Sequence, residues 1–250
     1  MSKIVLVTGA SSGIGRETAR QFALAGYNIA IHYNKNEQGA KSLVEELSQE
    51  LGSTSKLLIV QADVKYREQV DRMFSDVRQA FGIVDILVNN AGIAQTKLFT
   101  DITEQDFDEM FDTNVKGIFN CTQAALPGMI SRKEGKIINI SSIWGIAGAS
   151  MEVHYSAAKA AVIGMTKALA SELGPSNIHV NCVAPGVIQT PMLSEFSADE
   201  LAQLSEDAPL GRLGTPIDIA NTILFLASDK SDFITGQVIS PNGGLPILNI

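Results

Sequence analysis

The alternation of short apolar runs with amphipathic helical stretches constrains the fold of this chain most strongly. "KIVLVTG", at residues 3–9, is a short apolar run ending in glycine, which is typical of a strand buried on both faces. Six further runs follow, in "NIAIHY", "KLLIVQADV", "VDILVNNAG", "GKIINISS", "IHVNCVAPG" and "GQVISPNGG". Strands that alternate with helices form βαβ crossovers, so we expect a parallel sheet with helices on both faces.

The stretches between these runs carry apolar residues at helical spacing. The spacing predicts helices at 14–26, 36–51, 66–81, 103–131, 152–173 and 216–227. Gly174 and Pro175 end the fifth helix. Residues 187–212 are polar, with scattered prolines and no strong period, which indicates an insertion or lid over the substrate. Without a linker or a break in composition, the chain is expected to form one doubly wound α/β domain of Rossmann type over 1–250, with a seven-stranded parallel sheet.

Composition and charge argue against several classes of protein. Hydrophobic residues make up 45% of the 250 residues and the formal net charge is −8, which suits a folded globule and argues against a nucleic-acid binder. The first apolar run is too short for a signal peptide, and no later run is long enough to cross a bilayer. Cys121 and Cys182 lie in apolar contexts, which indicates buried thiols rather than a disulfide framework. We therefore expect a cytoplasmic protein without nucleic-acid or membrane partners.

A glycine-rich turn, "TGASSGIG", follows the first run. Gly9, Gly13 and Gly15 allow a tight turn and a close approach to a phosphate, and the next helix offers its N-terminus to negative charge. The spacing differs from the usual G-x-G-x-x-G, but the position between strand and helix favours dinucleotide binding. An ordinary tight turn is the alternative.

Two further strand ends carry candidate ligand contacts. Asp63, after the third run, is placed to accept from an adenine amino group, or alternatively to cap the next helix. "NNAG", at residues 89–92, has small residues against which a flat ligand could lie, with turn chemistry as the alternative.

Tyr155 and Lys159 lie four residues apart in "HYSAAKAAVIG", so a helix presents both on one face. If that face is solvent-exposed, the pair is an ordinary surface feature. If it lines a cleft, the ammonium eases proton transfer from the phenol, whose unperturbed pKa is about 10. The histidines His32, His154 and His179 suit no metal cluster, so no metal site is expected.

The motifs "TGASSGIG", "NNAG", "NISS", "YSAAK" and "APG" occur in this order at strand ends. In this respect the chain resembles the short-chain dehydrogenase/reductase family, from about residue 3 to residue 244. Tyr-x-x-x-Lys thirteen residues after a serine, with the other motifs in order, carries the resemblance. The overall residue pattern and the ending "GQVISPNGG" most resemble those of the bacterial 3-oxoacyl-acyl-carrier-protein reductases.

The resemblance implies hydride transfer between a nicotinamide and a carbonyl or alcohol. It implies that Tyr155 is the general acid, that Lys159 favours the phenolate and binds the nicotinamide ribose, and that Ser142 donates to the substrate oxygen. Asn114 would hold a water that leads protons to the lysine. Taken singly, Ser142 could instead cap a strand end, and Asn114 could kink a helix. Trp144 is expected either to touch substrate or to pack in the core.

The resemblance also implies a set of cofactor contacts. They are Gly9, Ser12, Gly13, Ile14, Gly15, Asn34, Lys35, Asp63, Val64, Asn90, Ala91, Gly92, Tyr155, Lys159, Pro185, Gly186, Ile188 and Thr190. Tyr33 stands near the place of the acid that binds the ribose 2′-hydroxyl in NAD-preferring relatives, and Lys35 is close by, so NADPH is expected, with NADH possible. Against this, Ser12 stands where many NADPH-using relatives carry a basic residue. Arg16 could take the role of that basic residue unless its side chain faces solvent.

Three hypotheses for the physiological function stay open, and they differ in the substrate. The first is a 3-oxoacyl thioester with acyl carrier protein as a candidate partner, for which Arg132, Lys133 and Lys136 form a candidate docking patch. Ser176, where close relatives often have a second arginine, speaks against that docking, and a solvated helix end is the alternative reading of the patch. The others are a free ketone, sugar or steroid, and a nonenzymatic nucleotide sensor. The family also implies a homotetramer built on the 103–131 and 152–173 helices, where Ala157, Ala161 and Gly164 permit close approach.

Overall fold

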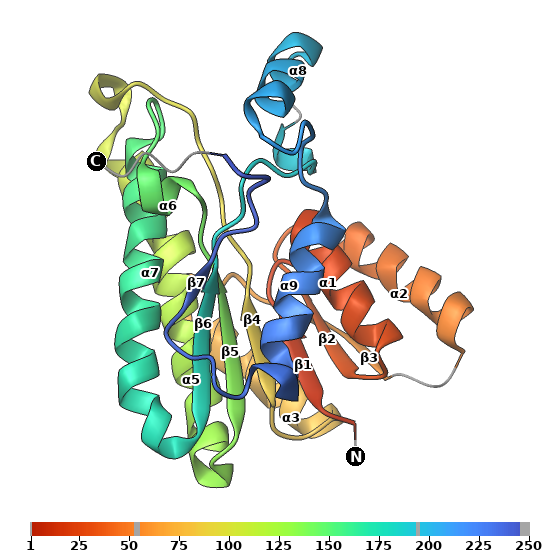
Figure 1. The fold of residues 1–250 in the computed structure, drawn as a ribbon. Helices are drawn as coiled ribbons and strands as arrows, with labels where there is room; N and C mark the ends of the chain where they lie inside the picture. Colours follow the sequence, from red (N-terminus) through yellow and green to blue (C-terminus); the bar gives the residue numbers. More distant parts are fainter. Residues whose placement is uncertain (1, 53–55, 194–195, 246–250) are drawn as a thin grey trace.

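One parallel sheet organises the molecule (Figure 1). The computed structural model describes residues 2–52, 56–193 and 196–245. All pairings between neighbouring strands are parallel, and the order is β3-β2-β1-β4-β5-β6-β7. The strands are β1 (Ile4–Val7), β2 (Asn28–Tyr33), β3 (Leu57–Gln61), β4 (Ile86–Asn89), β5 (Gly135–Ile140), β6 (Ile178–Val183) and β7 (Val238–Ile239). The predicted doubly wound α/β fold is confirmed, with its topological switch between β1 and β4.

Helices cover both faces of the sheet, because alternate strand residues point to opposite sides. Val5 and Val7 pack with α1 (Gly13–Leu24), α2 (Glu37–Leu51) and α9 (Pro216–Ala227) on one face. Ile4 and Leu6 pack with α3 (Arg67–Ala80), α5 (Gly117–Arg132) and α7 (Val153–Leu173) on the other. The five inner strands, β2, β1, β4, β5 and β6, are therefore buried on both sides, as their continuous apolar runs predicted, whereas the edge strands β3 and β7 are partly exposed.

The helical region predicted over 103–131 is present, but it is not a single regular α-helix. The chain forms a 3₁₀ turn, η1 (Phe99–Asp101), then α4 (Glu104–Phe111), a π-helical turn, η2 (Asp112–Lys116), and only then α5. Within η2, the Asn114 amide donates to Met110 O, one turn back, at 3.1 Å. A side chain that bonds the helix's own backbone while reaching a neighbouring segment accounts for the wider turn.

The segment 187–212, predicted as an insertion or lid, contains more helix than its weak periodicity indicated. This segment contains a 3₁₀ turn, η4 (Pro191–Leu193), and a ten-residue helix, α8 (Ala198–Asp207), that projects from the body (Figure 1). Ser197 and Glu200 form a capping box at the start of α8, which stabilises a helix whose composition is polar. Residues 194 and 195 lie outside the described part of the chain.

Shorter differences lie at other element ends. A single-turn helix, α6 (Trp144–Ala147), precedes α7, and 3₁₀ turns follow α7 at η3 (Gly174–Ser176) and α9 at η5 (Asp229–Ser231). Gly174 and Pro175 end α7 as predicted. In the described residues, we find no helix with the length and apolar character that a membrane crossing requires.

Candidate active site

The residues predicted to bind a cofactor lie beyond the carboxyl ends of the strands. Gly9 follows β1, Lys35 follows β2, Asp63 follows β3 and Gly92 follows β4, while Gly186 follows β6. In a parallel sheet these ends share one edge, so the structure brings residues far apart in sequence to one side of the molecule.

The glycine turn packs against the end of β4 with no room for side chains. Gly9 and Gly13 have φ values of +65° and +55°, which glycine adopts without strain. A Cβ on Gly15 would lie 2.3 Å from Gly9 O and 2.4 Å from Asn90 Nδ2. Asn90 also donates to Thr8 O and Gly9 O, at 2.9 and 3.1 Å. The turn is thus fixed as a bare backbone surface at the N-terminus of α1, which suits a phosphate.

His32 is a part of this turn that the sequence reasoning missed. Its Nδ1 accepts from Gly9 N at 2.9 Å, and its Nε2 lies 2.9 Å from Ala62 O. Because Ala62 O can only accept, the proton sits on Nε2 and the ring is neutral. Burial lowers the pKa of His32 to about 4. The sequence places His32 in a predicted strand, but only the fold could show that its side chain reaches the turn.

The predicted adenine and ribose contacts occupy the loops after β2 and β3. Asp63 does not cap α3, since the N-cap is Tyr66; its carboxylate accepts from Lys65 N at 3.1 Å. The alternative interpretation of Asp63 as a helix cap is therefore wrong. Lys35 is exposed, whereas Arg16 donates to Gly39 O and Glu46 Oε2, both at 2.7 Å. Arg16, on α1, thus forms an ion pair with Glu46 on α2.

Four side chains predicted to be catalytic converge beside β4 and β5. Tyr155 and Lys159 are 9% and 4% exposed, so the interpretation of the pair as surface neighbours is wrong. Lys159 Nζ donates to Ile140 O at 3.0 Å and lies 5.6 Å from the centre of the Tyr155 ring. The Ser142 hydroxyl accepts from Trp144 N at 3.1 Å, and it acts to lower the pKa of the Tyr155 phenol. A Cβ on Gly92 would lie 2.5 Å from Asn114 Oδ1 and 3.3 Å from Lys159 Nζ, so these polar groups meet at one backbone position.

Burial dominates the protonation of this cluster. It raises the pKa of Tyr155 to about 12, while the Ser142 hydrogen bond opposes the rise and the Glu152 charge adds to it. Burial also lowers the pKa of Lys159 to about 8. In the protein alone, the lysine does not overcome the desolvation of the phenol, contrary to the simple expectation from their spacing. The phenol therefore holds its proton at neutral pH, as an acid must before it donates.

The segment after β6 closes the site from the other side. Pro185 is buried and its carbonyl accepts from Ile143 N at 2.9 Å, just beyond Ser142. A Cβ on Gly13 would lie 3.3 Å from Thr190 Cγ2, so Thr190 adjoins the glycine turn. Ile188 is buried and pairs with Gly214 in an isolated bridge. A pocket of about 620 Å³ adjoins Thr190 and is lined also by Leu193 of η4, Leu201 of α8 and Leu213.

These observations fit a dinucleotide. The bare turn would hold its pyrophosphate, Asp63 and Val64 would meet its adenine end, and the nicotinamide end would lie between Thr190 and Lys159. Trp144 packs with Met110, Tyr155 and Ala158 instead of standing free.

Comparison with known proteins decides the family. A family model described as Enoyl-(Acyl carrier protein) reductase, adh_short_C2, matches residues 9–246. The chain is 46% identical over 245 residues to the 3-oxoacyl-[acyl-carrier-protein] reductase FabG of Staphylococcus epidermidis, covering 98% of this chain and 99% of the relative. It belongs to the short-chain dehydrogenase/reductase family. It is an NAD(P)-dependent oxidoreductase, so the expectation of a nonenzymatic nucleotide sensor is not supported.

Other members of the short-chain dehydrogenase/reductase family show the same extent of similarity. The FabG of Thermotoga maritima is 42% identical over 245 residues, with 98% of each chain covered. The uncharacterized oxidoreductase YmfI of Bacillus subtilis is 42% identical over 244 residues, with 98% of this chain and 99% of the relative covered. A crystal structure of a 3-oxoacyl-[acyl-carrier protein] reductase from Brucella melitensis superposes with a TM-score of 0.91 at 34% identity, covering 97% of this chain and 91% of that chain.

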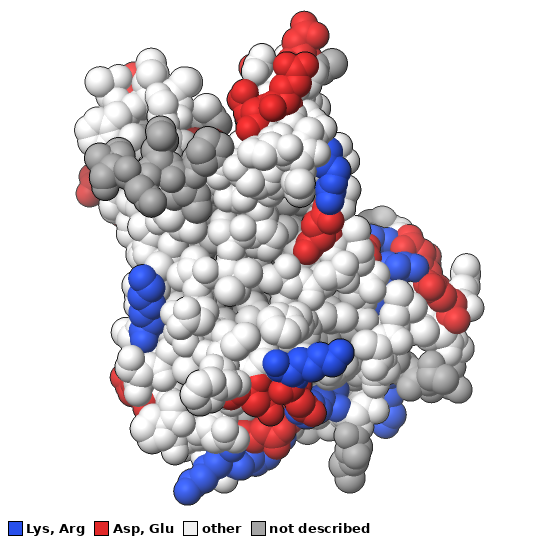
Figure 2. Space-filling model, in the orientation of Figure 1, with Lys and Arg blue, Asp and Glu red and all other residues white. Residues whose placement is uncertain are grey.

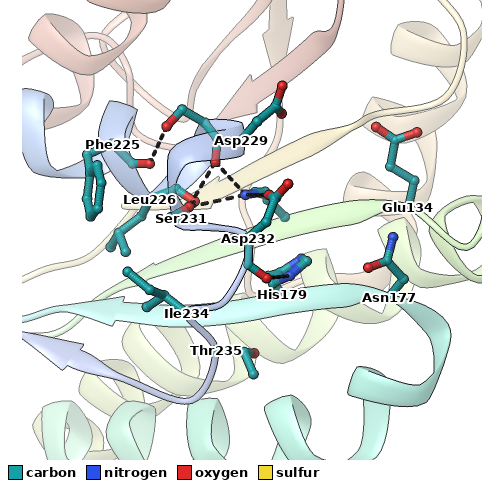
Figure 3. Close-up of polar contacts among 12 residues, drawn as sticks. Glu134, Asn177, His179, Phe225, Leu226, Asp229, Ser231, Asp232, Ile234 and Thr235 are labelled. Carbon is teal, nitrogen blue, oxygen red and sulfur yellow. Dashed lines mark hydrogen bonds and ion pairs between the residues drawn. The ribbon is translucent and has the colours of Figure 1, made fainter.

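The basic residues suggested as a docking patch lie at the opposite end of the sheet from the short-chain dehydrogenase/reductase site. Lys136, at the start of β5, is 8% exposed, and its amine donates to Ser228 O, Ser231 Oγ and Asp232 Oδ1 at 2.6, 3.1 and 2.7 Å. Figure 3 shows Ser231 and Asp232 side by side in this cluster. Arg132 pairs with Asp85 at 2.8 Å. Only Lys133 of the three is exposed without an ion pair among the described residues, so the patch does not exist as a unit.

Acidic and apolar side chains surround the mouth of the site. The segments 92–102, 143–153 and 187–214 carry two basic residues, Lys97 and Arg212. Lys97 pairs with Asp106 at 2.6 Å, and Arg212 with Asp218 at 2.8 Å. By contrast α8 carries only acids among its charged residues, and Figure 2 shows acidic side chains over this projecting helix. Large exposed apolar side chains on the same segments are Leu98, Phe99, Met151, Met192 and Leu210.

Proposed function

We propose that this enzyme reduces the ketone of a 3-oxoacyl thioester to an alcohol with NADPH. The convergence of Ser142, Tyr155, Lys159 and Asn114 beside the glycine turn is the observation that carries the proposal. The FabG names of the relatives from Staphylococcus epidermidis and Thermotoga maritima support the thioester.

The chain's own residues would divide the work on the carbonyl. Bound NADPH supplies the hydride. The Ser142 hydroxyl donates to the substrate oxygen and holds it near Tyr155, whose phenol gives its proton to that oxygen as negative charge develops. A donor aimed at developing charge typically stabilises a transition state by about 3 kcal/mol. The Lys159 ammonium, held by Ile140 O, favours the resulting phenolate and binds the ribose. Asn114 would hold the water from which the proton is restored.

The preference for NADPH rests on the loop after β2. That loop carries no carboxylate at Tyr33, Asn34 or Lys35 to repel a 2′-phosphate, and the Lys35 ammonium is exposed beside it. Arg16 contributes little to this preference, because Glu46 already neutralises it at 2.7 Å. NADH remains the alternative cofactor.

A second candidate function is the reduction of a free ketone that no acidic carrier delivers. The charges around the mouth favour it, because Lys97 and Arg212 are both neutralised by acids of their own chain while α8 is acidic. An acidic carrier protein would approach this face against like charge.

A homotetramer also belongs to the proposal, as does a cytoplasmic location. Ala157 and Gly164 on α7 are exposed and do not pack on the sheet, and Phe119 and Ile130 on α5 are 49% and 44% exposed. These side chains form the kind of apolar surface that an interface between subunits covers.

A panel assay tests both candidate functions. NADPH and NADH oxidation would be followed with acetoacetyl carrier protein, acetoacetyl coenzyme A, the neutral acetoacetyl thioester of N-acetylcysteamine, and simple ketones and sugars. A higher kcat/KM for carrier-bound than for neutral thioester supports carrier delivery. The reverse order supports the free substrate, and absence of turnover on every carbonyl would reject both.

A further inference from the structure

The chain that leaves β4 is fastened to the catalytic elements at three points. The first is Ile93, whose N–H donates to Asn114 Oδ1 at 3.3 Å and whose carbonyl accepts from Asn114 Nδ2 at 3.0 Å. Ile93 also packs against the cluster that contains Tyr155 and Ala158. The segment 93–98, here called the 93–98 loop, therefore begins beside the catalytic phenol.

The second point joins the loop to the catalytic helix through a buried histidine. His154, the residue before Tyr155, is 2% exposed, and its Nε2 lies 2.9 Å from Gln95 Oε1. Gln95 Nε2 in turn donates to Asp106 Oδ1 at 2.9 Å. One glutamine side chain thus spans from α7 to α4.

The direction of every hydrogen bond in this row is determined by Asp106. The Lys97 ammonium and the Thr103 hydroxyl hold the pKa of that carboxyl well below its usual range, so it is ionised and only accepts. Gln95 must therefore turn its NH₂ group to Asp106 and its oxygen to His154. His154 must then donate from Nε2. Its Nδ1 is buried and has no hydrogen-bond partner among the described residues, so the neutral ring donates its one proton to Gln95.

The third point is Lys97, two residues after Gln95 in the loop. Lys97 N donates to Met151 O, just before α7, at 2.7 Å, and Lys97 Nζ donates to Asp106 Oδ2 at 2.6 Å. Asp106 also caps α4 with Thr103. In Figure 1 the chain between β4 and α4 runs beside α6 and the upper end of α7. Asp106 is thus the common anchor of the loop, of α4 and, through Gln95, of the catalytic helix.

We propose that His154, Gln95 and Asp106 form a positioning row that fixes the 93–98 loop against the catalytic helix and thereby sets the affinity for the carbonyl substrate. Among the described residues, no hydrogen bond or ion pair joins any of the three to the side chains of Ser142, Tyr155 or Lys159, so we infer that they act through the loop. The inference rests on the proposed function only in treating Tyr155 as the site of reaction. Its mechanical part, the fastening of the loop, does not depend on which substrate is reduced.

Two substitutions break the row at different members. His154→Phe keeps a flat ring but removes the donor, and Gln95→Met keeps the length of the side chain but removes both hydrogen bonds. Each is expected to raise the KM for the carbonyl substrate about fivefold, the effect of one net hydrogen bond, with kcat and the Kd for NADPH within twofold of the wild type. The double variant should be no worse than the single variants, because both remove the same connection. His154→Gln retains a donor and should restore most of the affinity.

Hydrogen exchange measured by mass spectrometry tests the fastening without any substrate. Peptides covering 93–98 should exchange faster in His154→Phe and Gln95→Met than in the wild type, while peptides from β1 and β5 should not change. His179→Phe is the matched control, because His179 Nε2 is also hydrogen-bonded, to Asp232 O at 2.9 Å, but at the far end of the sheet. That variant should leave loop exchange and KM unaltered.

The outcomes separate this proposal from the proposed function. If the wild type reduces no carbonyl but loop exchange responds as described, the function fails and the positioning row stands. Unchanged exchange and KM in both variants, or additive effects in the double variant, would overturn the row. A loss of kcat and NADPH affinity with unchanged KM would also overturn it, since that pattern indicates a general structural role. Gln95 is only half-buried, so its variant carries the test if His154→Phe fails to fold.

Discussion

At the scale of residues, burial determines what the catalytic groups can do. The same desolvation that raises the pKa of Tyr155 to about 12 lowers that of Lys159 to about 8. The phenol is therefore kept protonated, and the amine is kept close to the loss of its charge. Both groups therefore titrate above neutral pH, and the ammonium loses its proton well before the phenol does.

The pH dependence of the reaction should report the lysine. Lys159 is cationic below about pH 8 and neutral above it, so kcat/KM for carbonyl reduction should fall about tenfold per unit above pH 8. Lys159→Arg keeps its charge at these pH values, so its profile should lack this limb at a lower absolute rate. A wild-type profile that stays flat from about pH 6 to pH 10 would contradict the role of the charge.

The buried His32 makes the stability of the fold depend on pH. His32 is neutral in the fold down to about pH 4 but is protonated in the unfolded chain below about 6.5. Acid therefore favours the unfolded state, and the free energy of unfolding should fall by about 3 kcal/mol between those pH values on this account. His32→Gln, which can still accept from Gly9 N, should show a smaller fall in urea titrations at pH 7 and pH 4.5. An equal fall in both proteins would count against this role.

Contacts between side chains could be predicted from the sequence where both residues belong to one motif. They could not be predicted where the two residues are distant in sequence and the fold brings them together. The spacing of Tyr155 and Lys159 predicts a shared helix face, and both side chains are indeed buried together. The sequence could not show that His32 meets Gly9 or that His154 meets Gln95. Those partners are 23 and 59 positions away, so only the packed elements bring them together.

At the scale of elements, continuous apolar runs made the strands predictable. The elements that differ from prediction, α8 and the π-helical turn η2, depend on hydrogen bonds of individual side chains. The capping pattern of Ser197 and Glu200 signalled the start of α8, but the prolines and polar residues around it concealed the helix. The π turn at Asn114 was not predictable from period, because a five-residue turn depends on the contacts of one side chain with Ile93 and Met110.

The junction of β5 with the turn after α9 offers a test of an element contact. Lys136→Met removes three hydrogen bonds from a buried amine and leaves Asp232 without its partner. We expect a loss of about 2 kcal/mol in the free energy of unfolding, with kcat/KM unchanged, because the cluster lies opposite the site. Lys133→Met, at the exposed neighbour, is the control and should alter neither quantity. Equal stability of the two variants would show that the cluster is not an anchor.

At the scale of the whole molecule, the exposed face of α7 tests the proposed assembly. A Cβ on Gly164 meets no atom of the described residues within 4 Å, so Gly164→Arg should leave the fold of one subunit unstrained. In an interface the same side chain would clash. We expect a smaller particle by light scattering than the wild type, whereas Ala80→Arg on α3 should keep the wild-type mass. An unchanged mass for Gly164→Arg would place the interface elsewhere.

The central claim is that one buried phenol, in a site formed by the carboxyl ends of β1, β4, β5 and β6, donates the proton that completes carbonyl reduction. Tyr155→Phe tests it most directly, with NADPH affinity from fluorescence titration and turnover from NADPH oxidation on the best substrate of the panel. The account predicts a Kd for NADPH within twofold of the wild type and a turnover reduced by about 10³-fold or more. Turnover within about tenfold of the wild type would contradict it.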